Sequence, residues 1–147
     1  MTEIIQKDKG DTGLVQVIAD LDKHKIKIAI PLSEHLPFDV IAINQAGQLS
    51  RVSIKYKSMS NGLIAIPLRS ISTNMKGWKA KTIDFSDIDA MAIYCPDTEH
   101  CYYIPSSFLK DCKSTFTLRV SDSKKNRKDI HWARDYFNPN VLFHWSR

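Results

Sequence analysis

Two segments rich in β-branched residues, separated by a short turn, constrain the fold more than any other part of the chain. They cover residues 38–43 and 49–57, and the connection between them contains Gly47. Valine, isoleucine and aromatic residues favour strands, and a glycine between two such runs favours a tight turn. The sequence therefore predicts a β-hairpin over residues 38–57.

The second strand of this predicted hairpin has one polar and one apolar face, because successive side chains of a strand point to opposite sides. Asp39 lies at the start of the first strand, directly after Pro37 and Phe38. The hairpin thus places the carboxylate of Asp39 and the ammonium group of Lys55 on paired strands. The polar face of the second strand carries Arg51, Ser53, Lys55 and Lys57, and its apolar face carries Val52, Ile54 and Tyr56.

The remaining segments predict an α/β fold. Apolar residues at helical spacing indicate an amphipathic helix that begins with Asp11 or Thr12 as its N-cap. Residues 70–81 have no clear period, and we interpret them as a long loop. A short helix is expected near residues 106–110, and alternating or β-branched runs predict further strands at 25–30, 63–68, 91–94, 101–104 and 116–120.

Composition favours one domain. A length of 147 residues with 43% hydrophobic content is enough to bury an ordinary core. We expect this domain to span residues 1–147, with a core at about 9–105 and a basic, aromatic extension at 106–147. Three cysteines without the close spacing of a zinc site indicate neither a disulfide framework nor a structural metal. The same cysteine pattern favours a reduced, cytoplasmic compartment. No segment has a membrane-spanning length, so we expect a soluble protein.

Positive charge is unevenly distributed along the chain. The formal net charge is +5, and residues 40–83 contain no Asp or Glu, which suits a polyanionic partner. A two-stranded ribbon fits the major groove of DNA, where Arg and Lys reach guanine edges or phosphates. The alternatives are a solvated face and, for the second basic block, a disordered segment. The candidate DNA contacts are Arg51, Lys57, Arg69, Lys76, Lys79 and Lys81, and in the second block Lys124, Lys125, Arg127 and Lys128.

Five segments share an order and a spacing that extend over residues 9 to 105. They are 9–13 with the helix that follows, 37–41, 51–55, 88–94 and 102–105, with the sequences KGDTG, PFDVI, RVSIK, IDAMAIY and YYIP. Together they resemble the PD-(D/E)XK endonuclease family, which includes bacterial group I intron-encoded homing endonucleases. The resemblance implies a restriction-endonuclease-like core in which helices flank a mixed β-sheet. It also implies hydrolysis of both strands of DNA at a specific sequence, with Mg2+.

The resemblance assigns roles to three residues of the hairpin. Asp39 is expected to bind the divalent metal, and the carbonyl oxygen of Ile54 to add a ligand. Lys55 is expected to position the attacking water or to stabilise the charge on the phosphate in the transition state. The sequence pattern therefore predicts that Asp39 and Lys55 lie on neighbouring strands of one mixed sheet.

Two positions depart from the family pattern. Leu14 stands where the pattern has Glu, and Ser53 stands where it has Asp, Glu or Gln. Both changes remove oxygen ligands or groups that orient the metal, although a serine hydroxyl can hold a water or act as a weak ligand. Asp11 and Glu34 are close enough in sequence to compensate as metal ligands. Their alternatives are a helix cap for Asp11 and a solvated loop charge for Glu34.

Three functions are consistent with these observations. The first is an intron-homing endonuclease that acts on double-stranded DNA as a homo-oligomer, a dimer or tetramer, because cutting both strands with one small site per chain requires at least two copies. The second is a catalytically impaired or inactive DNA-binding protein of the same fold. The third, an interaction protein that binds no nucleic acid, leaves the uneven charge unexplained.

Overall fold

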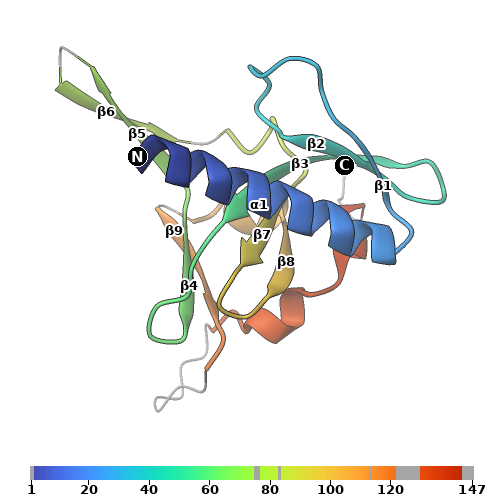
Figure 1. The fold of residues 1–147 in the computed structure, drawn as a ribbon. Helices are drawn as coiled ribbons and strands as arrows, with labels where there is room; N and C mark the ends of the chain where they lie inside the picture. Colours follow the sequence, from blue (N-terminus) through green and yellow to red (C-terminus); the bar gives the residue numbers. More distant parts are fainter. Residues whose placement is uncertain (1, 75–76, 83, 113, 122–129, 144–147) are drawn as a thin grey trace.

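A mixed sheet of five strands forms the centre of the fold (Figure 1). The structure is a computed structural model that describes residues 2–74, 77–82, 84–112, 114–121 and 130–143. The strands lie in the order β1-β2-β3-β7-β8; β3 and β7 are parallel, and the other neighbours are antiparallel. Their bounds are Lys27–Ala29 for β1, Val40–Ile43 for β2, Leu49–Tyr56 for β3, Ala90–Cys95 for β7 and His100–Pro105 for β8.

The predicted hairpin is confirmed as β2 and β3. Val40 pairs with Val52, and Ile43 pairs with Leu49 at the turn. The turn is closed by Asn44, whose side chain donates to the amide oxygen of Gln48 at 2.8 Å and accepts from the backbone N–H of Gln48 at 2.8 Å. Gly47 supplies a φ of 79°, a conformation that costs glycine little. The register of β3 against β2 is therefore fixed by its own turn.

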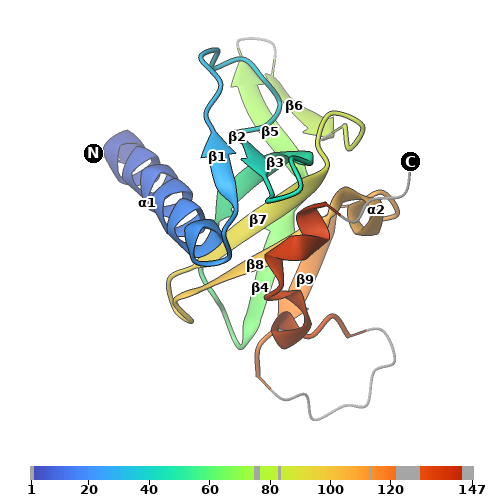
Figure 2. The same ribbon diagram turned by 90° about the vertical axis from the view of Figure 1, so that its right-hand side faces the viewer.

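A long helix, α1 (Thr2–Lys23), packs along one face of the sheet (Figure 2). Its buried residues include Val17 and Leu21, which form one core with side chains of β2, β3, β7 and β8. A Cβ added at Gly13 would lie 3.4 Å from that of Tyr56, so the helix passes close to the backbone of β3. None of the described helices is both long and apolar enough to cross a membrane.

The predicted start of this helix, at Asp11 or Thr12, is wrong. Helix α1 begins at Thr2, and Asp11 lies in its interior as an exposed residue instead of capping its N-terminus. Extending a helix that is already anchored by packing adds one hydrogen bond per residue without a new nucleation cost. The first turns therefore need no apolar stripe of their own, and apolar spacing does not reveal them.

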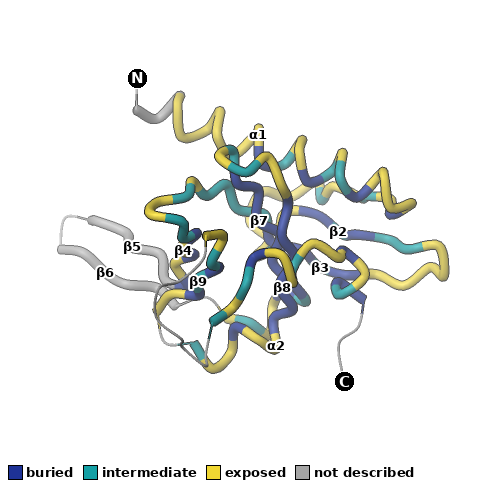
Figure 3. The backbone as a smooth tube through the Cα atoms, turned by 90° about the horizontal axis from the view of Figure 1, so that it is seen from below, coloured by how far each residue is buried: buried dark blue, intermediate teal, exposed yellow. Residues whose placement is uncertain are grey.

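A second core covers the opposite face of the sheet. It is built from β4 (Leu63–Pro67) and β9 (Thr115–Arg119), which pair antiparallel, and from α2 (Ser106–Leu109). Two 3-10 helices follow β9, η1 (Ala133–Tyr136) and η2 (Pro139–Leu142). Figure 3 shows that β7 is buried along its length between these layers. The predicted strands at 63–68, 91–94, 101–104 and 116–120 and the helix near 106–110 are confirmed, and the strand predicted at 25–30 is shorter, as β1.

The long loop predicted over residues 70–81 is wrong. Strands β5 (Arg69–Asn74) and β6 (Gly77–Thr82) form an antiparallel two-stranded sheet that projects from the rest of the fold (Figure 1). Asn74 pairs with Gly77, so only two residues connect the strands. The ribbon has no continuous apolar run, and the period-two signal that reveals half-buried strands is weak in such a segment.

Two glycine substitutions test the length of α1. We expect Gly10→Ala to raise the free energy of unfolding by about 0.5–1 kcal/mol, because alanine is the better helix former and no atom within 4 Å would meet the new Cβ. Gly47→Ala is the matched control. It places the same methyl group in equally open space but at a φ of +79°, and it should lower stability by about 1–2 kcal/mol. Urea unfolding measures both changes. An unchanged free energy of unfolding for Gly10→Ala would contradict a helix that includes the residues before Asp11.

Candidate functional site

Asp39 is held against β3 through both its backbone and its side chain. Its N–H donates to the carbonyl oxygen of Val52 at 2.9 Å, and its Oδ2 accepts from the N–H of Ile54 at 2.7 Å. Strand β2 begins at Val40, so the position opposite Ile54 lies outside the strand. The carboxylate thus takes the place of a strand carbonyl. This arrangement fixes Asp39 beside the segment that carries Ser53, Ile54 and Lys55.

Ser53 and Lys55 lie on the face of β3 that is turned away from α1. In the parallel ladder Ser53 pairs with Met91 and Lys55 with Ile93, and both partners belong to the second core. Ser53 is 8% exposed, and Lys55 is half-buried. Lys55 lies on β3 of the mixed sheet, as predicted, whereas Asp39 lies directly before the first residue of β2 and not on the strand itself. Asp39 itself is exposed, which leaves the site open to a large ligand.

Lys57 adds a second positive charge next to Lys55. Its N–H donates to the carbonyl oxygen of Tyr94 at 2.9 Å, which continues the ladder beyond the end of β3. Burial, and secondly the charge of Lys55, lower the pKa of Lys57 below its usual range. An anion bound beside the two lysines would favour the charged form of Lys57, because opposite charges stabilise each other. The end of β3 therefore favours a negatively charged ligand such as a phosphate.

The donor set around Asp39 fits a divalent cation with one carboxylate. The hydrogen bond from Ile54 uses Oδ2 of Asp39, and the described hydrogen bonds include none to its Oδ1 or to the Ser53 hydroxyl. The N–H and C=O of one strand residue point to the same side, so the Ile54 carbonyl points toward Asp39 as its N–H does. These are hard oxygen donors, which Mg2+ prefers. The described residues contain no group of three or more His, Cys, Asp or Glu side chains that could hold a metal.

The other predicted ligands lie on different elements. Leu14 is half-buried on α1 and packs against the core on that side of the sheet, whereas Ser53 and Lys55 are on the opposite face. Asp11 is exposed one turn earlier on α1, and Glu34 is exposed in the loop before β2. In the described part of the chain, neither carboxylate is hydrogen-bonded to Asp39 or Lys55. Asp11 and Glu34 remain predictions as metal ligands.

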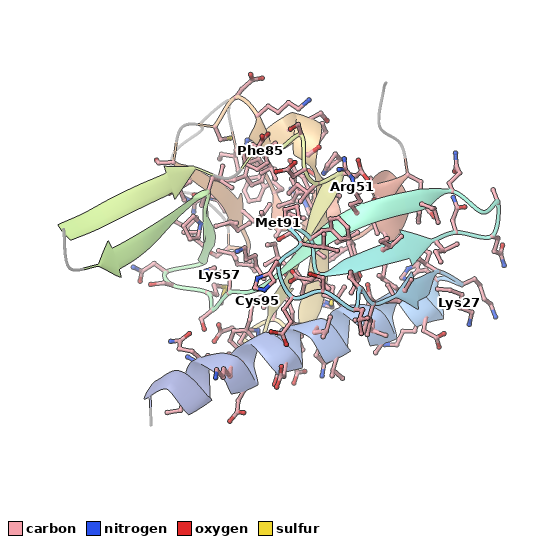
Figure 4. The ribbon with its side chains drawn as sticks, turned by 90° about the horizontal axis from the view of Figure 1, so that it is seen from above. Lys27, Arg51, Lys57, Phe85, Met91 and Cys95 are labelled. Carbon is pink, nitrogen blue, oxygen red and sulfur yellow. The ribbon has the colours of Figure 1, made fainter. Side chains whose placement is uncertain are left out.

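Arg51 binds a carboxylate that the sequence did not assign to the site. Its Nε and Nη2 donate to Asp89 at 3.2 and 3.1 Å, and its Nη2 also donates to the carbonyl oxygen of Ser86 at 3.1 Å. The two backbones are also joined, because the N–H of Asp89 donates to the Arg51 carbonyl at 2.8 Å. The side-chain hydrogen bond to Asp89 raises the pKa of Arg51 above its usual value. Figure 4 shows Arg51 and Lys57 toward opposite ends of β3.

This ion pair limits what Arg51 can offer to DNA. Of its guanidinium nitrogens, only Nη1 has no partner among the described residues. The pair joins Arg51, near the start of β3, to Asp89, which directly precedes β7. It therefore stabilises the pairing of the strand that carries Lys55. No sequence signal pointed to Asp89 as the partner, because the two residues are 38 positions apart. A DNA contact by Arg51 remains a prediction.

The other predicted DNA contacts belong to the β5–β6 ribbon or to segments that are not described. The backbone register pairs Lys79 with Ser72 and Lys81 with Ser70, and Arg69 with Thr82. Lys57 is half-buried at the end of β3, where the ribbon and the sheet are connected through β4. Outside the described residues lie Lys76, Lys124, Lys125, Arg127 and Lys128.

Comparison with known proteins identifies a family and a similar solved structure. A family model described as PD-(D/E)XK endonuclease matches residues 4–138. The fold is similar to that of a bacterial homing endonuclease, I-Ssp6803I, with a TM-score of 0.73 and 22% sequence identity over 88% of this chain and 86% of that one. No curated protein matched the sequence. The predicted restriction-endonuclease-like α/β fold is therefore confirmed.

The hydrogen bond between Asp39 and Ile54 has a measurable effect on stability. We expect Asp39→Ala to lower the free energy of unfolding by about 1–2 kcal/mol, because it leaves the Ile54 N–H without its acceptor. Asp39→Asn should cost less, since the amide oxygen still accepts. Asp22→Ala, which removes an exposed carboxylate from an ion pair with Lys27, is the control and should cost less than about 1 kcal/mol. Equal losses for Asp39→Ala and Asp22→Ala in urea unfolding would contradict this role.

Proposed function

This chain belongs to the PD-(D/E)XK endonuclease family, and from that premise we propose that it hydrolyses phosphodiester bonds of double-stranded DNA at a specific sequence, with Mg2+ as cofactor. One observation supports this most strongly. The carboxylate of Asp39 accepts a hydrogen bond from the backbone N–H of Ile54, directly before Lys55, and Lys57 follows directly after the end of β3. A carboxylate oxygen suited to a metal ion and two positive charges suited to a phosphate therefore lie along one short stretch at the end of β3.

The proposed roles follow from these positions. Asp39 holds the cation, with the Ile54 carbonyl and the Ser53 hydroxyl as further oxygen donors. The cation supplies Lewis-acid stabilisation of the charge that develops on the phosphate and lowers the pKa of a water bound to it. Lys55 orients the attacking water or stabilises the phosphate charge. Lys57 strengthens the local positive potential, and burial, followed by the nearby charge of Lys55, lowers its pKa.

We assign DNA recognition to the basic part of the chain, residues 40–83, which contains no Asp or Glu. The β5–β6 ribbon has the two-stranded architecture that the major groove admits, and it extends from the body of the fold (Figure 2). The sequence of this ribbon contains basic residues and no Asp or Glu. Lys and Arg contacts to phosphates supply affinity, and contacts to base edges supply specificity. The basic residues of these two strands are Arg69, Lys79 and Lys81, and the sequence between the strands contains Lys76.

The proposed activity requires more than one chain. Each chain offers one small site around Asp39 and Lys55, whereas two strands of opposite polarity must be cut. Two-fold symmetry presents the same site to both strands. We therefore propose a homo-oligomer, a dimer or tetramer, that acts at a target of the intron-homing type.

A second candidate is a DNA-binding protein of the same fold that cuts slowly or not at all. Leu14 and Ser53 favour it, because neither supplies a negative charge and Leu14 is packed into the core beside α1. The cation is then attracted mainly by one carboxylate, and opposite charge is the principal source of its affinity. The two candidates share the DNA interface and differ in turnover.

Cleavage after selection from randomised DNA tests the proposed function. Duplexes with a randomised central segment are selected for binding in Ca2+, and the selected duplexes are then incubated with Mg2+ or with EDTA. We expect double-strand cuts with Mg2+ alone. Lys55→Ala should reduce the cleavage rate at least about 100-fold while binding is retained, as expected for loss of a group that stabilises transition-state charge.

Lys27→Ala is the control for loss of one positive charge, because Lys27 is exposed on β1 and pairs with Asp22. It should cut at the rate of the unaltered protein. Selected duplexes that are bound but remain intact with Mg2+ would support the second candidate. Failure to select any duplex, or affinity that does not fall as salt rises, would exclude both.

Restoring an oxygen ligand at position 53 tests the site assignment. We expect Ser53→Gln to raise the cleavage rate per folded molecule at least about tenfold, because an amide oxygen reaches farther toward the cation than the serine hydroxyl. Ser53→Met has nearly the same size without the oxygen and is the matched control. A rate for Ser53→Gln no higher than that for Ser53→Met, with both proteins folded by circular dichroism, would contradict the assignment.

A further inference from the structure

A cavity lies at the β8 edge of the sheet, away from Asp39. Its volume is about 340 Å3, and it is bordered by the turn between β7 and β8, the end of β9 and the helix η1. In the strand order, β7 and β8 separate this edge from β3. Its main lining residues are Thr98, His100, Arg119, Trp132, Arg134 and Phe137.

Aromatic rings form one wall of this cavity. Phe137 stacks on Tyr102 with the ring centroids 5.3 Å apart, and the His100 ring lies 4.9 Å from that of Phe137. Phe137 is nevertheless 41% exposed, although it is a large apolar residue. The Tyr102 hydroxyl is buried and donates to Oγ1 of Thr98 at 2.9 Å, which fixes the ring behind Phe137. The wall is therefore held in place by Tyr102, while part of the Phe137 ring remains exposed to solvent. An exposed aromatic ring in a fixed position can stack against a planar ligand.

Two guanidinium groups line the same cavity. That of Arg134 lies 4.5 Å from the centroid of the Trp132 ring, a stacked position that holds it in place. The backbone of Arg119 is fixed by its N–H, which donates to the His131 carbonyl at 2.8 Å. The ion pairs found among the described residues are Lys27 with Asp22 and Arg51 with Asp89, so neither cavity arginine has a carboxylate partner there. Arginine is well suited to phosphate, which it binds through two parallel N–H donors.

The contrast with a larger cavity shows what is specific to this one. A cavity of about 820 Å3 is bordered by Arg51 and Asp89, whose charges neutralise each other, and by apolar residues such as Ile41, Leu49 and Phe143. The smaller cavity combines partly exposed aromatic surface with two arginines that have no carboxylate partner among the described residues. A ligand that satisfies both features needs a planar ring and an anionic group.

We propose that the cavity at the β8 edge binds one nucleotide. Its base stacks on the wall formed by Phe137, and its phosphate is bound by Arg119 and Arg134. A volume of about 340 Å3 is at the small end of the range of ligand pockets, which favours one nucleotide unit over a longer segment. Base stacking of this kind accepts any base, so the site selects for a nucleotide and not for a sequence. The unit is either a free nucleotide or an unpaired nucleotide of a DNA strand.

Binding measured by two-dimensional NMR tests this site without metal and without cleavage, so its outcome is independent of the proposed endonuclease activity. The probes are the four deoxynucleoside 5′-monophosphates, the corresponding nucleosides, and a short single-stranded oligothymidylate. We expect the nucleotides to shift backbone resonances of Thr98, His100 and Arg134 in a saturable manner. Nucleosides should bind about tenfold more weakly, because they lack the phosphate.

Charge variants separate this site from general attraction of anions. Arg119→Ala and Arg134→Ala should each weaken nucleotide binding about tenfold, while Lys27→Ala, which also removes one positive charge, should leave it unchanged. Arg134→Lys should recover only part of the loss, because lysine keeps the charge without the planar stack on Trp132. Saturation by the monophosphates identifies a free nucleotide as a sufficient ligand, and saturation by the oligothymidylate alone identifies a DNA strand.

Two results would overturn the proposal. One is the absence of saturable shifts at the cavity with every probe. The other is equal loss of binding in Arg119→Ala and Lys27→Ala, which would show that the shifts report net charge. Thermal unfolding of each variant verifies that the loss is not caused by a failure to fold.

Discussion

The pairing of β3 on both of its edges is the constraint on which the rest of the structure depends. On one side the antiparallel register with β2 is set by the turn at Gly47, and on the other the parallel register with β7 is fastened by Arg51 and Asp89. A slip of one residue on either side would exchange the two faces of β3. Val52 would then leave the core beside α1, and Ser53 and Lys55 would enter it. The same register that buries the core therefore also presents the candidate site.

The site occupies the point at which regular pairing between β2 and β3 stops. Asp39 replaces a strand carbonyl as acceptor for Ile54, so its carboxylate is positioned by the requirement that backbone N–H groups be satisfied. This structural role and the proposed metal-binding role use different oxygens of one carboxylate. The hydrogen bond to Ile54 is therefore sufficient to hold Asp39 in this position, with or without a metal ion. Whether the site cuts DNA depends in addition on how many negatively charged groups bind the cation. Leu14 and Ser53 reduce that number, which is why turnover, and not fold or DNA binding, distinguishes the two candidate functions.

Local signals in the sequence predicted much of the fold, and non-local contacts account for most of what they did not. Alternation over residues 49–57 and the turn at Gly47 gave the hairpin with its correct face assignment, because both signals depend on neighbours in the chain. The first turns of α1 and the β5–β6 ribbon were missed, since neither buries a periodic apolar stripe. The bond between Arg51 and Asp89 joins residues 38 positions apart, and the cavity at the β8 edge combines segments from Thr98 to Phe137. Only the folded chain shows that these side chains meet.

The most direct measurement is the position of a cation in the protein bound to a duplex. Crystals of the complex grown with Ca2+, which occupies hard-oxygen sites and slows hydrolysis, would locate it by anomalous scattering. The account predicts Ca2+ within about 2.3–2.6 Å of an Asp39 carboxylate oxygen, next to a backbone phosphate that Lys55 also contacts. A cation bound elsewhere, or a duplex whose phosphates lie far from both Asp39 and Lys55, would contradict it.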